Sequence, residues 1–334
     1  MTNNPPNIFR IGVCTQEGAR LFQILKAALP TDDLYACAPR EVVAQAPQTD
    51  IFIPIVTRIP SEAFAAPRLQ LIQQFGVGLD CVDIPAASRA GVLVANVPSV
   101  GTGNAESVAE LAIAHMMMLG RELPLAFARF RERRVSSPLG HCLWRSTVVI
   151  LGYGGIGEEI ARRLAGFGTR IIAVSRRGPS GSRARDPHVH LDLHVDATQT
   201  VAVLGEADYV IVAAPATPEN IGLVDANAFA AMKPGTFLVN IARGPVVDYD
   251  ALLAALRAGR VAGAGLDVFW EEPFDPADPL LAENVIATPH VGGATERSLT
   301  GIGQAVAANI EQLRAGEMPA CCVNPEVGRR RLGK

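Results

Sequence analysis

The sequence has little that marks a secreted or membrane protein. Its 334 residues include only six cysteines, none in a C-x-x-C spacing, which argues against a disulfide scaffold. No apolar run reaches the roughly 18 residues of a membrane span, and the longest, residues 107–119, is broken by Glu110 and His115. The first ten residues carry Asn and Pro where a signal peptide needs basic residues followed by an apolar stretch. We therefore expect a cytoplasmic protein that binds no membrane.

The chain also lacks a strong charge of either sign. It has 30 Lys and Arg residues against 33 Asp and Glu residues, a formal net charge of −3 at pH 7. No basic stripe for nucleic acid is present, and the basic segment 329–334 is interpreted as a disordered tail rather than a nucleic-acid site. At this length a single hydrophobic core usually stops growing, so two domains are expected.

Short apolar runs alternate with helical patterns in the first third of the chain. We expect strands at residues 8–13, 50–56, 69–75 and 92–97, and an amphipathic helix at 18–29. Strands that alternate with helices are typical of parallel βαβ units. This third is therefore predicted to form a parallel α/β domain.

A second series of strands and helices begins in the middle of the chain. Residues 99–103 are rich in Ser and Gly and indicate a hinge, after which Asn104 caps a long helix with Glu106 in its first turn. The second series occupies residues 147–289, and one helix, 296–315, is left over. This arrangement suggests an inserted domain. The predicted domains are 1–103 together with 296–334, and 104–295.

A glycine-rich motif follows the first strand of the second series. The apolar run 148–151 leads into Gly-Tyr-Gly-Gly-Ile-Gly and then into a helical pattern at 158–167. A G-x-G-x-x-G between strand and helix predicts a dinucleotide site, with a tight turn at the first glycine, close approach of the pyrophosphate at the second and close packing at the third. The N–H groups of the helix then hold the phosphates. The residues predicted to contact the cofactor here are Gly152, Gly154, Gly155, Ile156 and Gly157.

The end of the next strand, residues 170–174, bears on the choice of cofactor. An Asp or Glu about 20 residues past the first glycine is typical of NAD binding, but the chain has Ser175, Arg176 and Arg177 there. An acid would repel a 2′-phosphate, whereas arginines bind it through charge-assisted hydrogen bonds. NADP(H) is therefore the predicted preference, with NAD(H) also able to bind. A solvated pair of surface arginines is the alternative.

Two groups of chemically active side chains are interpreted as structural. His115 falls on the buried stripe of the long helix and is expected to be a packed helix residue rather than a ligand. A stretch of alternating His and Asp residues is expected to form an exposed strand face rather than a metal site, and no metal is predicted. Its members are His188, His190, Asp192, His194 and Asp196.

Polar residues follow three apolar strands of the second series, which places them along one edge of a sheet. Arg243 follows the strand 236–241, acidic residues follow the run at 265–269, and His290 follows the run at 285–289. In open α/β sheets, ligands bind outside the carboxyl ends of the strands. An arginine, an acid and a histidine at that edge favour a catalytic site.

These motifs resemble the D-isomer-specific 2-hydroxyacid dehydrogenase family, which includes glyoxylate/hydroxypyruvate reductases and phosphoglycerate dehydrogenase. The resemblance covers nearly the whole chain. It implies two Rossmann-like parallel-sheet domains, with the dinucleotide-binding domain inserted into a flavodoxin-like substrate domain. It also implies a homodimer, with the helix from Asn104 in the interface. The matching segments are 75–80, 82–83, 106–110, 152–157, 242–244, 267–269, 272–273 and 288–290.

The resemblance assigns roles to single residues. Arg243 would bind the carboxylate and the 2-oxo oxygen of a small 2-oxo or 2-hydroxy acid, His290 would be the acid–base residue, and Glu272 its partner. Only the Glu-Pro adjacency of the family selects Glu272 over Glu271. The other implied contacts are backbone N–H groups of Val77 and Gly78 with the carboxylate, Asp267 with the nicotinamide carboxamide, and Val108, Pro215, Thr217 and Ala242 with the cofactor.

The chemistry of these residue types agrees with NAD(P)-dependent hydride transfer. Histidine, with a pKa of ~6.5, can protonate a developing alkoxide near neutral pH, and a guanidinium forms a planar fork that matches a carboxylate. Two alternatives are a nicotinamide-sensing corepressor-like scaffold and a formate dehydrogenase-like enzyme. By the same resemblance, formate dehydrogenases carry a Gln–His pair in place of the Glu–His pair. A role for Thr57 or Arg58 in the substrate pocket stays open.

Overall fold

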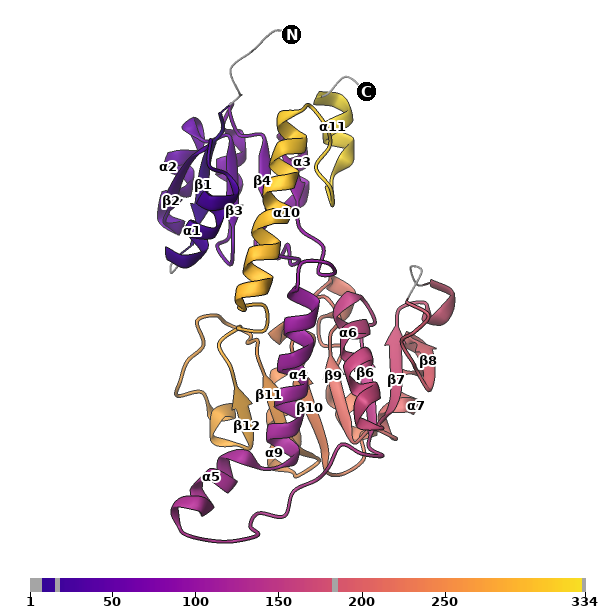
Figure 1. The fold of residues 1–334 in the computed structure, drawn as a ribbon. Coiled ribbons are helices and arrows are strands. Elements are labelled where there is room, and N and C mark those ends of the chain that lie inside the picture. Colours follow the sequence, from indigo (N-terminus) through magenta and orange to yellow (C-terminus); the bar gives the residue numbers. More distant parts are fainter. Residues whose placement is uncertain (1–7, 16–18, 182–185, 332–334) are drawn as a thin grey trace. The chain divides into compact units, whose positions relative to one another are not determined.

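The chain divides into two compact units, each built on one parallel sheet (Figure 1). The computed structural model describes residues 8–15, 19–181 and 186–331. Unit 1 comprises residues 1–104 and 296–334, and unit 2 comprises residues 105–295. The middle of the chain thus forms a unit of its own, and the last segment returns to the first.

Unit 1 contains a five-stranded parallel sheet in the order β2-β1-β3-β4-β5. This is the flavodoxin-like strand order, which confirms the fold class predicted for this part of the chain. Strands β3, β4 and β5 are fully buried and, apart from Gln73, apolar, as expected when helices cover both faces of a parallel sheet. The elements are β1 (Arg10–Cys14), α1 (Ala19–Ala28), β2 (Asp33–Cys37), α2 (Val42–Gln45), β3 (Ile51–Pro54), β4 (Leu71–Gln73), α3 (Ile84–Arg89), β5 (Leu93–Ala95), α10 (Glu296–Arg314) and α11 (Pro325–Arg331).

Helices from both ends of the chain cover the sheet of unit 1. α1 and α10 pack on one face, where Leu25 and Val306 are buried beside Ile11. The other face carries α2 and α3, around Phe52 and Val42. α10 therefore supplies part of the core of a sheet whose strands lie far earlier in the chain.

Unit 2 contains a seven-stranded parallel sheet in the order β12-β11-β10-β9-β6-β7-β8. The chain starts at β6, runs outward to β8, returns to β9 and runs outward again to β12, which is the Rossmann order with one more strand. The elements are α4 (Asn104–Gly120), α5 (Leu123–Arg131), β6 (Thr147–Leu151), α6 (Gly155–Leu164), β7 (Arg170–Ser175), β8 (Leu193–Asp196), α7 (Thr200–Leu204), β9 (Tyr209–Val212), α8 (Ala226–Ala231), β10 (Thr236–Asn240), α9 (Tyr249–Arg257), β11 (Val261–Leu266) and β12 (Val285–Ala287).

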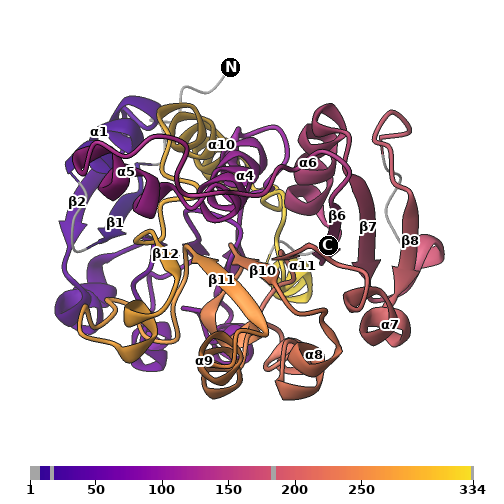
Figure 2. The ribbon, with the colours of Figure 1, turned by 90° about the horizontal axis from the view of Figure 1, so that it is seen from below.

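Helices also cover both faces of this sheet. Figure 2 shows α4 and α6 on one face and α7, α8 and α9 on the other. Asp225 and Asp248 cap α8 and α9 by accepting hydrogen bonds from backbone N–H groups of the first turn. Because all seven strands are parallel, their carboxyl ends meet at one edge of the sheet.

Two local expectations differ from the structure, and a third point concerns membrane spans. The alternating stretch that starts at His188 is not one strand, because β8 begins only at Leu193 and the preceding residues form a turn. The basic segment at the end is helical as far as Arg331, in α11, and residues 332–334 lie outside the described residues. In the described ranges no single helix is long and apolar enough to cross a membrane, and α4 and α5, which pass that test as a pair, meet at a bend of 53°.

Candidate active site

The glycines of the loop after β6 have different surroundings. Gly152 has a φ of +100°, and a Cβ there would clash with the backbone at Ala213 and Ala214. A Cβ on Gly157 would clash with the carbonyl oxygen of Gly152, so α6 packs directly on the loop. A Cβ on Gly154 would meet no atom within 4 Å. Gly154 therefore faces open space, where a ligand can approach the backbone.

Backbone N–H groups lie beside that open space. α6 begins at Gly155, and the N–H groups of Gly155 and Ile156 belong to its first turn, where the helix itself supplies no acceptor. Pro215 and Thr217 lie in the loop after β9, which reaches the same edge because β9 and β6 are parallel neighbours. The chain reverses its direction of travel across the sheet between these two strands, the usual ligand site of such folds. The residues present fit the pyrophosphate of a dinucleotide.

The end of β7 carries the residues predicted to select the cofactor. The Ser175 hydroxyl lies 2.8 Å from Nε2 of His194 on β8 and 3.3 Å from the carbonyl oxygen of Gly178. The side chains of Arg176 and Arg177 are exposed. The hydroxyl of Ser175 is thus already engaged, and the two guanidiniums are the groups that can reach out to a ligand.

Arg176 extends its influence to the loop after β9. A hydrogen bond with the Thr217 side chain, a backbone hydrogen bond and the charge of Arg176 together hold the pKa of Glu219 below its usual value. The charge of Arg176 is the smallest of these contributions.

His290 and Glu272 form a hydrogen-bonded pair. Nδ1 of His290 lies 2.8 Å from Oε2 of Glu272, and both side chains are one-third exposed. The other carboxylate oxygen of Glu272 accepts a hydrogen bond from the Phe269 N–H at 3.1 Å. The structure thus places Glu272 against the histidine. The family-based choice of Glu272 over Glu271 has this geometry in its favour.

Electrostatics also bring Arg243 to this pair. Burial opposes ionisation of Glu272, but the hydrogen bond and charge of His290, the Phe269 N–H and the charge of Arg243 outweigh it and lower the pKa of Glu272. The charges of His290 and Arg243 therefore both act on Glu272. The structure gathers the three predicted catalytic residues at one place.

The turn after β10 explains how Arg243 comes to lie there. The buried side chain of Asn240 accepts the Ala242 N–H at 3.0 Å and donates to the Arg243 carbonyl oxygen at 2.9 Å, which closes the turn. A Cβ on Gly244 would clash with the backbone of Phe269, so the turn packs directly on the segment that leads to the glutamate. Asn240 is a positioning residue that sequence reasoning did not identify.

Asp267 is buried and holds the loop that carries His290. Its Oδ1 accepts hydrogen bonds from the Thr288 hydroxyl at 2.6 Å and the Val291 N–H at 2.9 Å, and its Oδ2 accepts the Gly292 N–H at 2.8 Å. An ionised carboxylate has about four acceptor sites, so about one stays open for a ligand. The predicted bond to a nicotinamide carboxamide would use that position.

Two further predicted cofactor contacts border these loops. Val108 on α4 lies beside Gly292, where an added Cβ would come within 3.4 Å of its side chain. Ala242 directly precedes Arg243, whose guanidinium donates to the Ala242 carbonyl oxygen at 2.7 Å. Both residues belong to unit 2, at the same edge as the glycine loop. Their contact with a cofactor stays a prediction.

The two predicted carboxylate-binding residues belong to unit 1, in the loop after β4. The Asn96 amide donates to the Val77 carbonyl oxygen at 2.7 Å, and the Val97 N–H donates to the Gly76 carbonyl oxygen at 3.1 Å. Gly76 has a φ of +137°, a region that favours glycine. The turn that presents Val77 and Gly78 is therefore held from β5, and the role of its N–H groups stays a prediction.

Thr57 and Arg58, whose roles the sequence leaves open, have different surroundings in the structure. The buried Thr57 hydroxyl donates to the Cys14 carbonyl oxygen at 3.2 Å and ties the segment after β3 to β1. Arg58 is exposed. Thr57 thus has a structural partner, and only Arg58 offers a charge to solvent.

The alternating His and Asp residues do not gather at one point. His194 binds Ser175 as described, whereas His190 pairs with Asp192 at 3.4 Å and Asp192 accepts the Ile171 N–H at 2.7 Å. Within the described ranges no group of three or more His, Cys, Asp or Glu side chains has the geometry to hold a metal ion.

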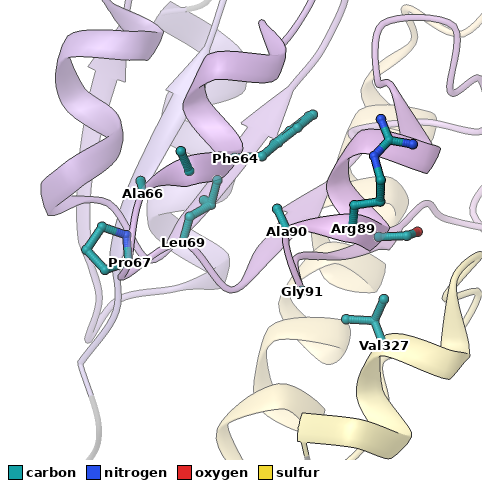
Figure 3. Close-up of a pocket in the computed structure, with 10 residues that line it drawn as sticks. Phe64, Ala66, Pro67, Leu69, Arg89, Ala90, Gly91 and Val327 are labelled. Atoms are coloured by element: carbon teal, nitrogen blue, oxygen red, sulfur yellow. The ribbon is translucent and has the colours of Figure 1, made fainter.

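A groove of about 490 Å³ lies elsewhere in unit 1, between the segment before β4, the end of α3 and α11 (Figure 3). Leu69 and Gly91 on its wall precede β4 and β5, so the groove lies at the amino ends of these strands. Ligands of such sheets bind at the carboxyl ends. None of the residues predicted for catalysis or cofactor binding lines this groove.

Comparison with known proteins agrees with the site. Residues 113–292 match the family model described as D-isomer specific 2-hydroxyacid dehydrogenase, NAD binding domain. The chain is 39% identical to a glyoxylate reductase of Thermococcus onnurineus over 81% of each chain. It is 37% identical to a D-3-phosphoglycerate dehydrogenase of Mycobacterium bovis over 85% of this chain and 53% of that protein.

The fold is similar to that of a solved relative with bound cofactor. The crystal structure of an NADPH-dependent glyoxylate/hydroxypyruvate reductase from Sinorhizobium meliloti, in complex with NADP and malonate, superposes with a TM-score of 0.79 at 30% identity. The match covers 94% of this chain and 96% of that one.

Proposed function

This chain belongs to the D-isomer specific 2-hydroxyacid dehydrogenase family, and on that basis we propose that it reduces a small 2-oxo acid such as glyoxylate, with NADPH as the preferred donor. It is an oxidoreductase that transfers a hydride between a nicotinamide cofactor and a 2-hydroxy or 2-oxo acid. The observation that carries the proposal is the His290–Glu272 hydrogen bond beside Arg243. It combines a proton source with a cation for a carboxylate.

Three residues of unit 2 have different roles in the proposed reduction. When bound, the nicotinamide supplies the hydride. Arg243 binds the carboxylate through its planar fork and polarises the neighbouring carbonyl. Since Glu272 engages Nδ1 of His290, the other ring nitrogen, Nε2, is the one that holds the proton for the developing alkoxide. Glu272 favours the imidazolium because an opposite charge stabilises it.

The preference for NADPH rests on the end of β7. No acid stands there to repel a 2′-phosphate, and Arg176 and Arg177 are exposed and able to turn toward one. The relative from Sinorhizobium meliloti is NADPH-dependent and holds NADP. The glyoxylate reductase of Thermococcus onnurineus supports glyoxylate as the first substrate to try.

The proposal is tested by kcat/KM for NADPH and NADH with glyoxylate, hydroxypyruvate, pyruvate and bulkier 2-oxo acids. We expect turnover of at least one small 2-oxo acid and a preference for NADPH of about tenfold or more, since one charge-assisted hydrogen bond contributes ~1.5–3 kcal/mol. Replacing Arg176 and Arg177 together by Ala should remove that preference. The exposed residues Arg40 and Arg89 of unit 1, also replaced by Ala, are the matched control.

Two results would contradict the cofactor assignment: a native enzyme that prefers NADH, or NADPH use that persists in the Arg176/Arg177 variant. Absence of turnover with every 2-oxo acid would favour the corepressor-like scaffold. A formate dehydrogenase-like activity is disfavoured by the Glu272–His290 pair, since formate oxidation has no alkoxide to protonate.

A homodimer formed through unit 2 is part of the proposal. Ten residues of α4 are buried, but its outer side carries a partly exposed apolar stripe of Leu111, Ala114, Met117 and Met118. Exposed apolar side chains continue on α5 and beyond, among them Leu125, Phe127, Phe130, Val135, Leu139 and Trp144. A concentration of exposed apolar side chains in one segment is typical of an interface. The six cysteines are all free thiols, which is consistent with the proposed cytoplasmic location.

A further inference from the structure

A histidine that the reaction does not use lies beneath the catalytic loop. His115 is a fully buried residue of α4. α4 covers one face of the sheet of unit 2 (Figure 2). His115 lies directly over Gly265 of β11, where an added Cβ would come within 2.7 Å of the Cβ of His115. The glycine thus leaves the space that the imidazole fills.

His115 is the first member of a row of hydrogen bonds that leads to the active site. Its Nε2 lies 3.2 Å from the Thr288 hydroxyl, which in turn donates to Oδ1 of Asp267 at 2.6 Å. Asp267 also accepts the N–H groups of Val291 and Gly292. One row of contacts therefore joins α4, the carboxylate and both ends of the Thr288–Gly292 loop.

The direction of each hydrogen bond in the row follows from proton counting. An ionised carboxylate only accepts, so the single hydroxyl proton of Thr288 points at Asp267. The hydroxyl oxygen is then an acceptor toward His115, and Nε2 of His115 must carry a proton. Burial lowers the pKa of His115, although the charge of Asp267 partly opposes this shift. A neutral ring protonated at Nε2 satisfies all of these conditions.

The other ring nitrogen shows that the imidazole is not there for packing alone. Nδ1 of His115 is buried, and the described part of the chain offers it no hydrogen-bond partner. A buried polar atom without a partner destabilises a fold. An apolar residue of similar size would fill the same space without that penalty. The one bond that the ring makes, to Thr288, is what distinguishes His115 from leucine.

The loop that this row holds has an unfavourable backbone conformation. His290 has a φ of +53°, in the left-handed region that residues other than glycine rarely adopt. Such a conformation persists only where the surroundings enforce it. Here the His290 N–H donates to the Asp267 carbonyl oxygen at 2.8 Å, and the Asp267 carboxylate holds the next two N–H groups.

We propose that His115 is a positioning residue for the reaction: it directs the Thr288 hydroxyl onto Asp267 and so holds the Thr288–Gly292 loop in the conformation that presents His290. This inference rests on the role proposed above for His290. His115 itself touches neither substrate nor cofactor. Its contribution is the orientation of the proton donor.

Three substitutions at one position separate the hydrogen bond from packing. In His115→Gln the amide nitrogen can take the place of Nε2, in His115→Asn it reaches only the place of Nδ1, and His115→Leu keeps the volume alone. We expect kcat to fall about tenfold in the Asn and Leu variants, the effect of losing one hydrogen bond in a charged network. The Gln variant should stay within about threefold of the native enzyme, and KM should change less than kcat throughout.

A second readout needs neither substrate nor cofactor. Amide hydrogen exchange of the peptide that contains Val291 and Gly292 reports directly whether Asp267 still holds the two N–H groups. Exchange should accelerate about tenfold in the Asn and Leu variants and stay native-like in the Gln variant. Native exchange in His115→Leu, or equal behaviour of the Gln and Asn variants, would overturn the proposal.

Thr288 provides an independent test if a change in α4 disturbs folding. Thr288→Val removes the hydroxyl at nearly constant volume, and Thr288→Ser keeps it. The Val variant should reproduce the loss of kcat and of exchange protection, and combining it with His115→Leu should add little, because both break the same row. Fully additive losses of kcat and of exchange protection in the double variant would show that His115 and Thr288 do not act through one row of hydrogen bonds. A native enzyme without any 2-oxo acid reductase activity would instead contradict the proposed function, and the exchange experiment would still report on the loop.

Discussion

The two ring nitrogens of His290 have different tasks because only one of them meets Glu272. The lowered pKa of Glu272 means that its carboxylate is ionised at every pH above that value. Its attraction for the imidazolium is therefore present throughout the neutral and alkaline range and is lost only when the pH falls through a pKa below the usual 4.5. An alkaline limb of the reduction rate therefore lies in the range where Glu272 is ionised.

Glu272→Gln should shift that limb. An amide keeps a hydrogen bond to Nδ1 but supplies no negative charge, so the imidazolium loses its proton more readily. We expect the alkaline limb of kcat/KM for reduction to move to lower pH by about one unit, measured in steady-state assays from pH 5 to 9. Glu271→Gln is the control, and its profile should match that of the native enzyme. A profile unchanged in Glu272→Gln would rule out the pairing.

Arg243 should be sensitive even to conservative replacement. Arg243→Ala leaves the substrate carboxylate without its cation, which typically costs ~1.5–3 kcal/mol or more, so kcat/KM should fall at least about tenfold. Arg243→Lys restores the charge but not the bidentate fork, so it should recover only part of the loss. Steady-state kinetics with the best 2-oxo acid provide the measurement. Full activity of the lysine variant would show that charge alone suffices.

The site residues that sequence reasoning missed are those whose partners lie far away in the chain. His115 and Thr288 are separated by 173 positions, and nothing in either neighbourhood indicates the other. Asn240 and the loop-holding role of Asp267 likewise depend on turns that only the folded backbone defines. Arg243, Glu272 and His290 could be predicted, because each follows a recognisable strand and belongs to a known motif. The sequence also predicted their common edge of the sheet, but the hydrogen bond between His290 and Glu272 required the structure.

At the scale of elements, two glycines near the start of α6 allow the effect of a substitution on stability to be distinguished from its effect on cofactor binding. Gly157→Ala should lower the Tm of unit 2 by several degrees, because overpacking against the Gly152 carbonyl costs about 1–3 kcal/mol. Gly154→Ala adds a methyl group to open space, so the Tm should stay native. It should nevertheless weaken NADPH binding at least about tenfold, because the methyl group occupies the place of the pyrophosphate.

Thermal unfolding and calorimetric titration with NADPH distinguish these two expectations. The two variants are controls for each other, since each adds the same methyl group within one turn of helix. Undiminished NADPH affinity in Gly154→Ala would place the pyrophosphate elsewhere.

Most of the strands that could be predicted have buried, mainly apolar sequences. β1, β3, β6 and β10 have buried, largely apolar interiors because helices cover the sheets on both faces. β2 was not predicted, because this edge strand is only partly buried and its sequence, DLYAC, opens with an exposed aspartate. The strand predicted to start near His188 was wrong because alternation of polar side chains does not by itself create a pairing partner.

At the scale of the whole molecule, the exposed apolar side chains on α4 and α5 predict the mass of the protein in solution. We expect light scattering at micromolar concentration to give twice the chain mass of 35.3 kDa. Replacing Met117 and Phe127 together by Glu places charges on that surface and should yield monomers. Val201→Glu, an exposed apolar position on α7, is the control and should leave the dimer intact. A native protein with the mass of one chain would contradict the dimer.

The position of α10 also has a consequence for synthesis on the ribosome. Unit 2 is one continuous segment and can fold as soon as residue 295 has emerged, whereas one face of the sheet of unit 1 stays uncovered until α10 follows. At about 5–20 residues per second, translation of residues 105–295, which separate the two parts of unit 1, takes on the order of ten seconds or more. For that time a nascent chain presents the apolar side chains of β1 and β3 to solvent, a binding surface for chaperones. Ribosome-bound chains stalled before residue 296 should therefore recruit them more strongly than the released full-length chain.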